Sequence, residues 1–351
     1  MFNEIKLGNT KETEKCKCNY ITALNGFLIA CVIAVHCGIM TRSVEMYDWN
    51  LVLLVIAAAT MMRMPWFFYK SGFFSEHDGS VRTKHYLKKY IRPFVLYGAI
   101  GSVVQILVTC VGYGVPFGKW ARDFLRIACV DNTVFGNGVL WFLLTLFLVR
   151  CFSDFILPKV HPLAVALLSI CFAYFHFRCA TPKTPWILGN FFSGLCFYSL
   201  GFFMKKHENK RWITILSFLM YIGYFLIMAF TPFKFSALYF QHNTTLVGES
   251  YLILFPLYFF GIIAIKVTFR WLSKYYSFPI MSYVGRNAMN FFVTHWMVLV
   301  VVQFVADKYF GILGTQRCFY LLVAACVFTL PLISKFINSM KAKKKCTIPI
   351  R

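Results

Sequence analysis

A succession of long apolar runs separated by short polar segments constrains this chain more than any other feature. A membrane-spanning helix needs about 20 mostly apolar residues, and lipid leaves a backbone no hydrogen-bond partners outside the helix itself. The runs cover residues 21–39, 51–73, 91–112, 138–156, 162–178, 186–204, 211–230, 248–269, 284–306 and 316–338. We therefore expect an all-α fold, a polytopic membrane helix bundle of about ten transmembrane helices.

Composition excludes the common alternatives. Apolar residues make up 59% of the 351 positions and charged residues only 14%, whereas soluble domains average about 45–50% and 25%. A disordered chain, a coiled coil and an ordinary soluble enzyme are therefore excluded. Most of the 13 cysteines lie inside apolar runs, which favours small buried side chains over a disulfide framework.

The basic residues indicate how the chain is oriented. The net charge of +23 would suggest nucleic acid in a soluble protein, but here the Lys and Arg residues fall in short segments between apolar runs. With ten spans, most of them lie on the side of the two termini, and basic loops stay in the cytoplasm. We expect cytoplasmic basic tails at 1–20 and 339–351, a single membrane domain at 21–338, and no nucleic-acid partner.

Two histidines lie inside predicted spans, where an ionisable side chain is a hypothesis about function. His36 lies about 22 Å along the first span from its cytoplasmic end. It could act as a general base or simply be hydrogen-bonded by a neighbouring helix. His295 follows Asn290 in the ninth span, and this spacing favours a hydrogen bond between helices.

The second span carries two cations. Arg63 cannot lose its proton, so within a membrane it needs an anion, carbonyl groups or water. Lys70 could reach the membrane surface with its long side chain. Between them Pro65 favours a kink, and Ser71-Gly72 allows a close helix approach. A broken helix that lines a cavity would explain this combination.

In the longest predicted outward segment, 113–137, the apolar residues around Trp120 recur at roughly helical spacing, and the charged residues lie on the opposite face. This pattern predicts a short amphipathic helix on the membrane surface, which could cover the bundle or contact substrate. Signatures of nucleotide-binding loops, serine hydrolases and zinc proteases are missing. His176 and His242 lie near the ends of predicted spans without Cys or acidic partners at metal-ligand spacing, so we expect no metal site. We expect no bound cofactor either.

Five stretches, taken in order, resemble one known family. They are LNGFLIACVIAVH at 24–36, RMPWFFYKSGFF at 63–74, LWFLLTLF at 140–147, FYSLGFFMKK at 197–206 and VGRNAMNFFVTH at 284–295. The family is the integral-membrane acyltransferase family 3, which includes many bacterial O-acetyltransferases of surface glycans.

The resemblance implies an O-acyltransferase of the bacterial inner membrane. Cytoplasmic acyl-CoA, acetyl-CoA in the simplest case, would be the donor substrate, and the acceptor would be a hydroxyl of a surface or lipid-linked glycan. The donor phosphates would meet the basic segments 82–92 and 205–211. His36 would be the general base or carry the acyl group, and Arg63 or Ser71 would polarise the thioester. The residues expected to bind donor or substrate are Asn25, Lys70, Ser71, Trp141 and His295.

One position departs from the family pattern. The family usually places Arg or Lys eleven residues before the first-span histidine, and this chain has Asn25 there. Asparagine can hydrogen-bond a phosphate but cannot neutralise its charge, so Arg63 or Lys70 would have to supply that charge. Two other functions are compatible with the residues: an exporter or flippase of an anionic lipid-linked sugar, and a non-catalytic scaffold.

Overall fold

The computed structural model describes residues 4–41, 62–76, 82–130, 136–179, 187–207, 210–230 and 249–346. Every regular element within these ranges is a helix. The chain divides into two compact units, Met1–Thr60 with Ile265–Arg351, and Met61–Ala264. We call them unit 1 and unit 2 and describe each by itself.

Unit 1 is built around α1 (Glu4–Thr41), which packs against three later helices. These are α13 (Pro279–Arg286), α14 (Ala288–Lys308) and α15 (Gln316–Cys346). The last turns of α12 (Glu249–Leu272) also belong to this unit. The sequence predicted one run over 284–306, but a break at Asn287 separates α13 from α14.

The backbones of α1 and α13 touch where two glycines meet. A Cβ atom on Gly26 would overlap the carbonyl group of Met281, and one on Gly285 would overlap that of Thr22. Small residues allow membrane helices to approach this closely. The crossing therefore depends on the absence of a side chain at both glycines.

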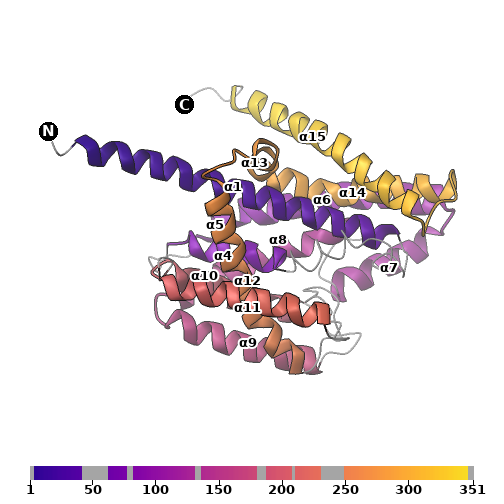
Figure 1. Ribbon diagram of the computed structural model, residues 1–351. Helices are drawn as coiled ribbons and strands as arrows, with labels where there is room; N and C mark the ends of the chain where they lie inside the picture. Colours follow the sequence, from indigo (N-terminus) through magenta and orange to yellow (C-terminus); the bar gives the residue numbers. More distant parts are fainter. Residues whose placement is uncertain are drawn as a thin grey trace. The chain divides into compact units, whose positions relative to one another are not determined.

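Side-chain contacts fix the directions of the helices in unit 1. Gln303, near the end of α14, donates to the carbonyl of Met40, near the end of α1, so these helices run the same way. Asn290, near the start of α14, donates to Asn338, near the end of α15, so α15 runs back. The start of α1 and the end of α15 therefore lie at the same end of unit 1, as Figure 1 shows.

Unit 2 holds the remaining helices. They are α4 (Arg63–Phe73), α5 (Thr83–Tyr86), η1 (Leu87–Ile91), α6 (Arg92–Ile106), η2 (Leu107–Gly112), α7 (Phe117–Val130), η3 (Gly138–Leu140), α8 (Trp141–Ile156), α9 (Pro162–Cys179), α10 (Ile187–Met204), α11 (Arg211–Phe230) and α12 as far as Ala264. The segments α5 to η2 form one continuous helical stretch, Thr83–Gly112. Helix α10 packs against α4, α8 and α9.

A second pair of glycines brings α4 and α10 together. A Cβ atom on Gly72 would overlap the carbonyl of Tyr198, and one on Gly201 would overlap that of Tyr69. Pro65 lies in the first turn of α4, where its missing N–H costs no helical hydrogen bond. The described helix therefore begins near Pro65, and the rest of the predicted second span, 51–61, lies outside the described residues.

Seven helices in the described ranges are long and apolar enough to cross a membrane. They are Tyr20–Thr41, Thr83–Gly112, Gly138–Ile156, Ile187–Met204, Phe255–Leu272, Ala288–Lys308 and Gln316–Ala342. Each overlaps a predicted span, which confirms that the described ranges are all-helical and hold several candidate membrane-spanning helices. Two other predicted spans form α9 and α11, whose apolar stretches are shorter. The count of ten and the cytoplasmic termini stay predictions.

Large apolar side chains also cover the outside of the helices. On α6 they include Val95, Leu96 and Val103, each more than half exposed, as expected of a surface that faces lipid tails. The predicted amphipathic helix forms as α7. In it the ring of Trp120 stacks on Phe117 and Phe124, with centroids 5.4 and 5.3 Å apart.

Candidate functional site

The two histidines predicted inside spans meet in unit 1. Nδ1 of His36 on α1 lies 2.9 Å from Nε2 of His295 on α14, a hydrogen-bond distance. The two ring planes differ by only 8°, and their centroids are 5.1 Å apart. Since the centroids lie so much farther apart than the nitrogens, the rings meet edge to edge and the hydrogen bond lies near both ring planes.

Each ring of this pair has further contacts that hold it. His295 is completely buried, and its Nδ1 lies 3.1 Å from the carbonyl oxygen of Phe291. His36 is half-buried. The indole of Trp296 meets its ring at 86°, with centroids 5.2 Å apart. The pair thus has one protected and one more accessible imidazole, as a base and its supporting group require.

A second group of predicted residues gathers in unit 2. Nε of Arg150 on α8 donates to the hydroxyl of Ser71 at 2.8 Å, and Nη2 donates to the Ser71 carbonyl at 3.3 Å. The charges of Lys89 and Arg150 are close enough to act on the ammonium of Lys70. Lys205, just beyond α10, donates to the carbonyl of Ser75 at 3.1 Å. We call Lys70, Lys89, Arg150 and Lys205 the cationic cluster.

One buried carboxylate supports this cluster. Asp154 is 3% exposed and accepts a hydrogen bond of 2.9 Å from the hydroxyl of Tyr86. The guanidinium of Arg150 lies over the ring of Tyr86, 5.4 Å from its centroid. Because Arg and Lys are the side chains that bind phosphate oxygens, the arrangement suits an anionic ligand.

Comparison with known proteins bears on both groups. The profile of a family described as an acyltransferase domain matches residues 19–335, a range that contains the histidine pair and the cationic cluster. The chain belongs to acyltransferase family 3. No curated protein and no solved structure matches the chain. Membership in the family confirms the resemblance seen in the sequence and indicates a membrane acyltransferase.

Three other predicted site residues of this acyltransferase are each separated, along their own helix, from the group in the same unit. Asn25 is buried on α1, eleven residues before His36 and so about 16 Å along the helix. Arg63 starts α4, about 10 Å along that helix from Lys70. Trp141 starts α8, about 13 Å along it from Arg150. Their roles in catalysis or binding stay predictions.

Arg150 is a site residue that the sequence analysis did not single out. It lies inside α8 and is half-buried. The signal was present, since Arg150 and Asp154 are both charged residues at the end of an otherwise apolar run. Charged residues in such runs are candidates for function.

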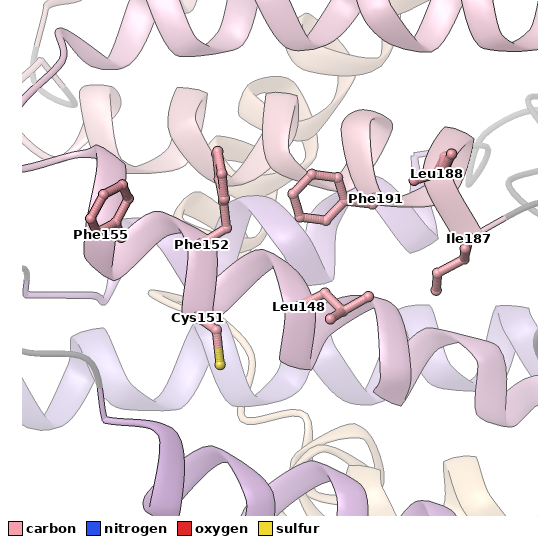
Figure 2. Close-up of a pocket in the computed structure, with 7 residues that line it drawn as sticks. All are labelled: Leu148, Cys151, Phe152, Phe155, Ile187, Leu188 and Phe191. Atoms are coloured by element: carbon pink, nitrogen blue, oxygen red, sulfur yellow. The ribbon is translucent and has the colours of Figure 1, made fainter.

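The acyltransferase also has an apolar groove in unit 2, between α8 and α10 (Figure 2). Its volume is about 490 Å³. It is lined by Leu148, Cys151, Phe152, Phe155, Ile187, Leu188 and Phe191. A groove lined in this way can hold a hydrocarbon chain but supplies no acid, base or cation. Within the described ranges, no three His, Cys, Asp or Glu side chains gather as a metal site would require.

Proposed function

We propose that the protein is an O-acyltransferase that moves an acyl group from acyl-CoA to a hydroxyl of a glycan, with His36 as general base. The observation that carries this proposal is the hydrogen bond between His36 and His295 in a chain of an acyltransferase family. A histidine near an accepting partner can take a proton at neutral pH. Few other groups in a membrane span can do so.

The reaction balances with His36 as the only proton carrier. His36 takes the proton of the acceptor hydroxyl as the oxygen attacks the thioester carbonyl carbon. The carbon–sulfur bond breaks, and the leaving thiolate receives the same proton. Ester and free thiol are formed, and His36 returns to its starting state. Arg63 is our candidate for polarising the thioester carbonyl.

The cationic cluster is our candidate for binding the phosphates of the donor. Coenzyme A carries several phosphate groups, and each is recognised best by Lys or Arg. Lys89 and Lys205 come from the two basic segments expected to meet these phosphates, and both are exposed. Arg150 is already oriented by Ser71, which lowers the entropy lost when it binds an anion.

For the acceptor we propose a surface or lipid-linked glycan, modified at a bacterial inner membrane. This part of the proposal rests on the family, whose bacterial members the sequence resembles. The match to an acyltransferase domain favours catalysis over the exporter and the non-catalytic scaffold.

The test is transfer of labelled acetyl from acetyl-CoA in membrane vesicles that contain the protein. Wild type is compared with His36→Ala, at equal expression. His161→Ala is the matched control, because His161 is an exposed histidine of unit 2 and belongs to neither group. We expect label in a glycan fraction, a loss of about 10²-fold to 10⁴-fold in His36→Ala, and no loss in the control.

The outcomes separate the alternatives. No label with acetyl-CoA or longer acyl-CoAs in wild type would overturn the enzyme proposal and favour the exporter or scaffold. Equal label in wild type and His36→Ala would keep the enzyme and discard His36 as its base. Label that accumulates on the protein itself and is lost in His36→Ala would identify His36 as an acyl carrier.

A further inference from the structure

The two hydrogen bonds of His295 restrict where its protons can be. A carbonyl oxygen only accepts, so the Nδ1 atom that faces Phe291 must carry a hydrogen. His295 is completely buried, and a charge buried without compensation costs far more than a neutral group. The imidazole is therefore neutral, with its single hydrogen on Nδ1 and its lone pair on Nε2.

This state of His295 determines the state of His36. Nε2 of His295 can only accept, so the Nδ1 atom of His36 that lies 2.9 Å away must donate. A neutral His36 then has its hydrogen on Nδ1 and its lone pair on Nε2. The direction of the whole chain of hydrogen bonds, from His36 through His295 to the Phe291 carbonyl, follows from one fixed acceptor.

We propose that His295 is a positioning residue that holds His36 in the tautomer with Nδ1 protonated, so that Nε2 is the basic atom. This inference rests on the proposed function of His36 and adds the atom at which the proton moves. His295 touches neither substrate in this mechanism. It keeps its own Nδ1 hydrogen throughout, and its Nε2 atom accepts from the His36 imidazolium that forms during transfer.

Two amide substitutions at position 295 separate this role from simple packing. A glutamine side chain reaches about as far as Nε2 of histidine, so His295→Gln can place an accepting oxygen against His36. An asparagine side chain reaches only as far as Nδ1, so His295→Asn can contact the Phe291 carbonyl but not His36. Both variants are polar and smaller than histidine, and they form a matched pair.

The first measurement is the tautomer of His36, read from nitrogen chemical shifts of ¹⁵N-histidine-labelled protein in lipid. The signal is assigned by its loss in His36→Gln. We expect hydrogen on Nδ1 in wild type and His295→Gln, and a shift toward hydrogen on Nε2 in His295→Asn. Hydrogen on Nε2 of His36 in the wild type would overturn the proposal.

The second measurement is acetyl transfer by the same variants at equal expression. We expect kcat to fall on the order of 10²-fold or more in His295→Asn, since a base held in the wrong tautomer loses most of its activity. The kcat of His295→Gln should be at least tenfold higher than that of His295→Asn. Donor KM should change little in either variant. Equal losses in both variants would assign His295 a packing role and overturn the proposal.

The two measurements also keep this inference apart from the proposed function. If His36 has the expected tautomer but no acyl-CoA is used, the function is wrong and the histidine geometry stands. If transfer occurs and depends on His36, but the tautomer does not respond to position 295, the function stands and the positioning role is lost.

Discussion

Arg150 of α8 is joined to Ser71 of α4 through two hydrogen bonds, one to the hydroxyl and one to the carbonyl, across 79 positions of sequence. The side-chain bond of 2.8 Å is short and involves a charged donor, the stronger class of hydrogen bond. It orients the guanidinium beside Lys70 before any ligand arrives. The consequences for donor binding can be measured.

The geometry of Arg150 should matter as well as its charge. Arg150→Gln removes the charge, whereas Arg150→Lys keeps it but loses the planar fork of donors. We expect the KM for acetyl-CoA to rise about tenfold or more in Arg150→Gln, because a hydrogen bond to a charged group contributes about 1.5–3 kcal/mol. Arg150→Lys should show a smaller rise. Initial rates in vesicles over a range of acetyl-CoA concentrations check this.

A control for Arg150 is available on the same helix. Phe152 is exposed on the apolar groove, and Phe152→Leu leaves all charges in place. We expect its donor KM to equal that of the wild type. An unchanged donor KM in Arg150→Gln would remove the cationic cluster from the donor site.

The glycine contact between α4 and α10 should tolerate no side chain. Gly72→Ala introduces a methyl group against the Tyr198 carbonyl, and overpacking of this kind costs about 1–3 kcal/mol or more. The free energy of unfolding in detergent should fall accordingly. Gly223→Ala is the control, because a Cβ atom there meets nothing within 4 Å. It should be neutral or stabilising by up to about 1 kcal/mol. Equal changes in the free energy of unfolding in Gly72→Ala and Gly223→Ala would contradict the close crossing of α4 and α10.

The amide of Asn290 connects α14 to α15 in unit 1. It donates to Ser334 at 3.2 Å and to Asn338 at 3.0 Å, and it accepts from Lys341 at 3.2 Å. Asn290→Ala leaves these partners without the amide, so we expect the free energy of unfolding to fall by about 1–3 kcal/mol.

Asn338→Ala is the comparison for this network. Asn338 is exposed, and water can replace the hydrogen bonds that it loses, so the fall in unfolding free energy should be smaller than for Asn290→Ala. Thermal unfolding of both variants in detergent shows which one loses more stability. A larger loss in Asn338→Ala would mean that the buried amide does not anchor the network.

Restoring the usual basic residue at position 25 should harm the protein. Asn25 is 5% exposed and adjoins Gly26 at the crossing of α1 and α13. Asn25→Arg would both overpack this region and bury a charge, so we expect a loss of about 3 kcal/mol or more of stability. Asn25→Ala should cost less, because it adds no volume. A stable and more active Asn25→Arg variant would show that the site accepts a cation.

Much of the architecture could be predicted from the chain itself. Seven of the predicted spans coincide with long apolar helices, and the amphipathic segment around Trp120 is a helix. These features are local, because the length and polarity of a run decide whether it can span a membrane. The break at Asn287 was missed, since the residues on both sides are apolar enough to be read as one run.

The sequence by itself determined the family and the types of residue that could do chemistry. It also indicated that the chain is suited to a lipid bilayer. Only the tertiary structure decided which of these residues act together. It placed His295 against His36 across 259 positions, and it brought Arg150 to Ser71 while leaving Trp141 and Arg63 at other points of their helices. The physical reason is that a hydrogen bond needs two atoms within about 3 Å. Which helices approach that closely depends on packing, above all on glycine contacts such as those of Gly72 and Gly201, and not on the composition of any single span.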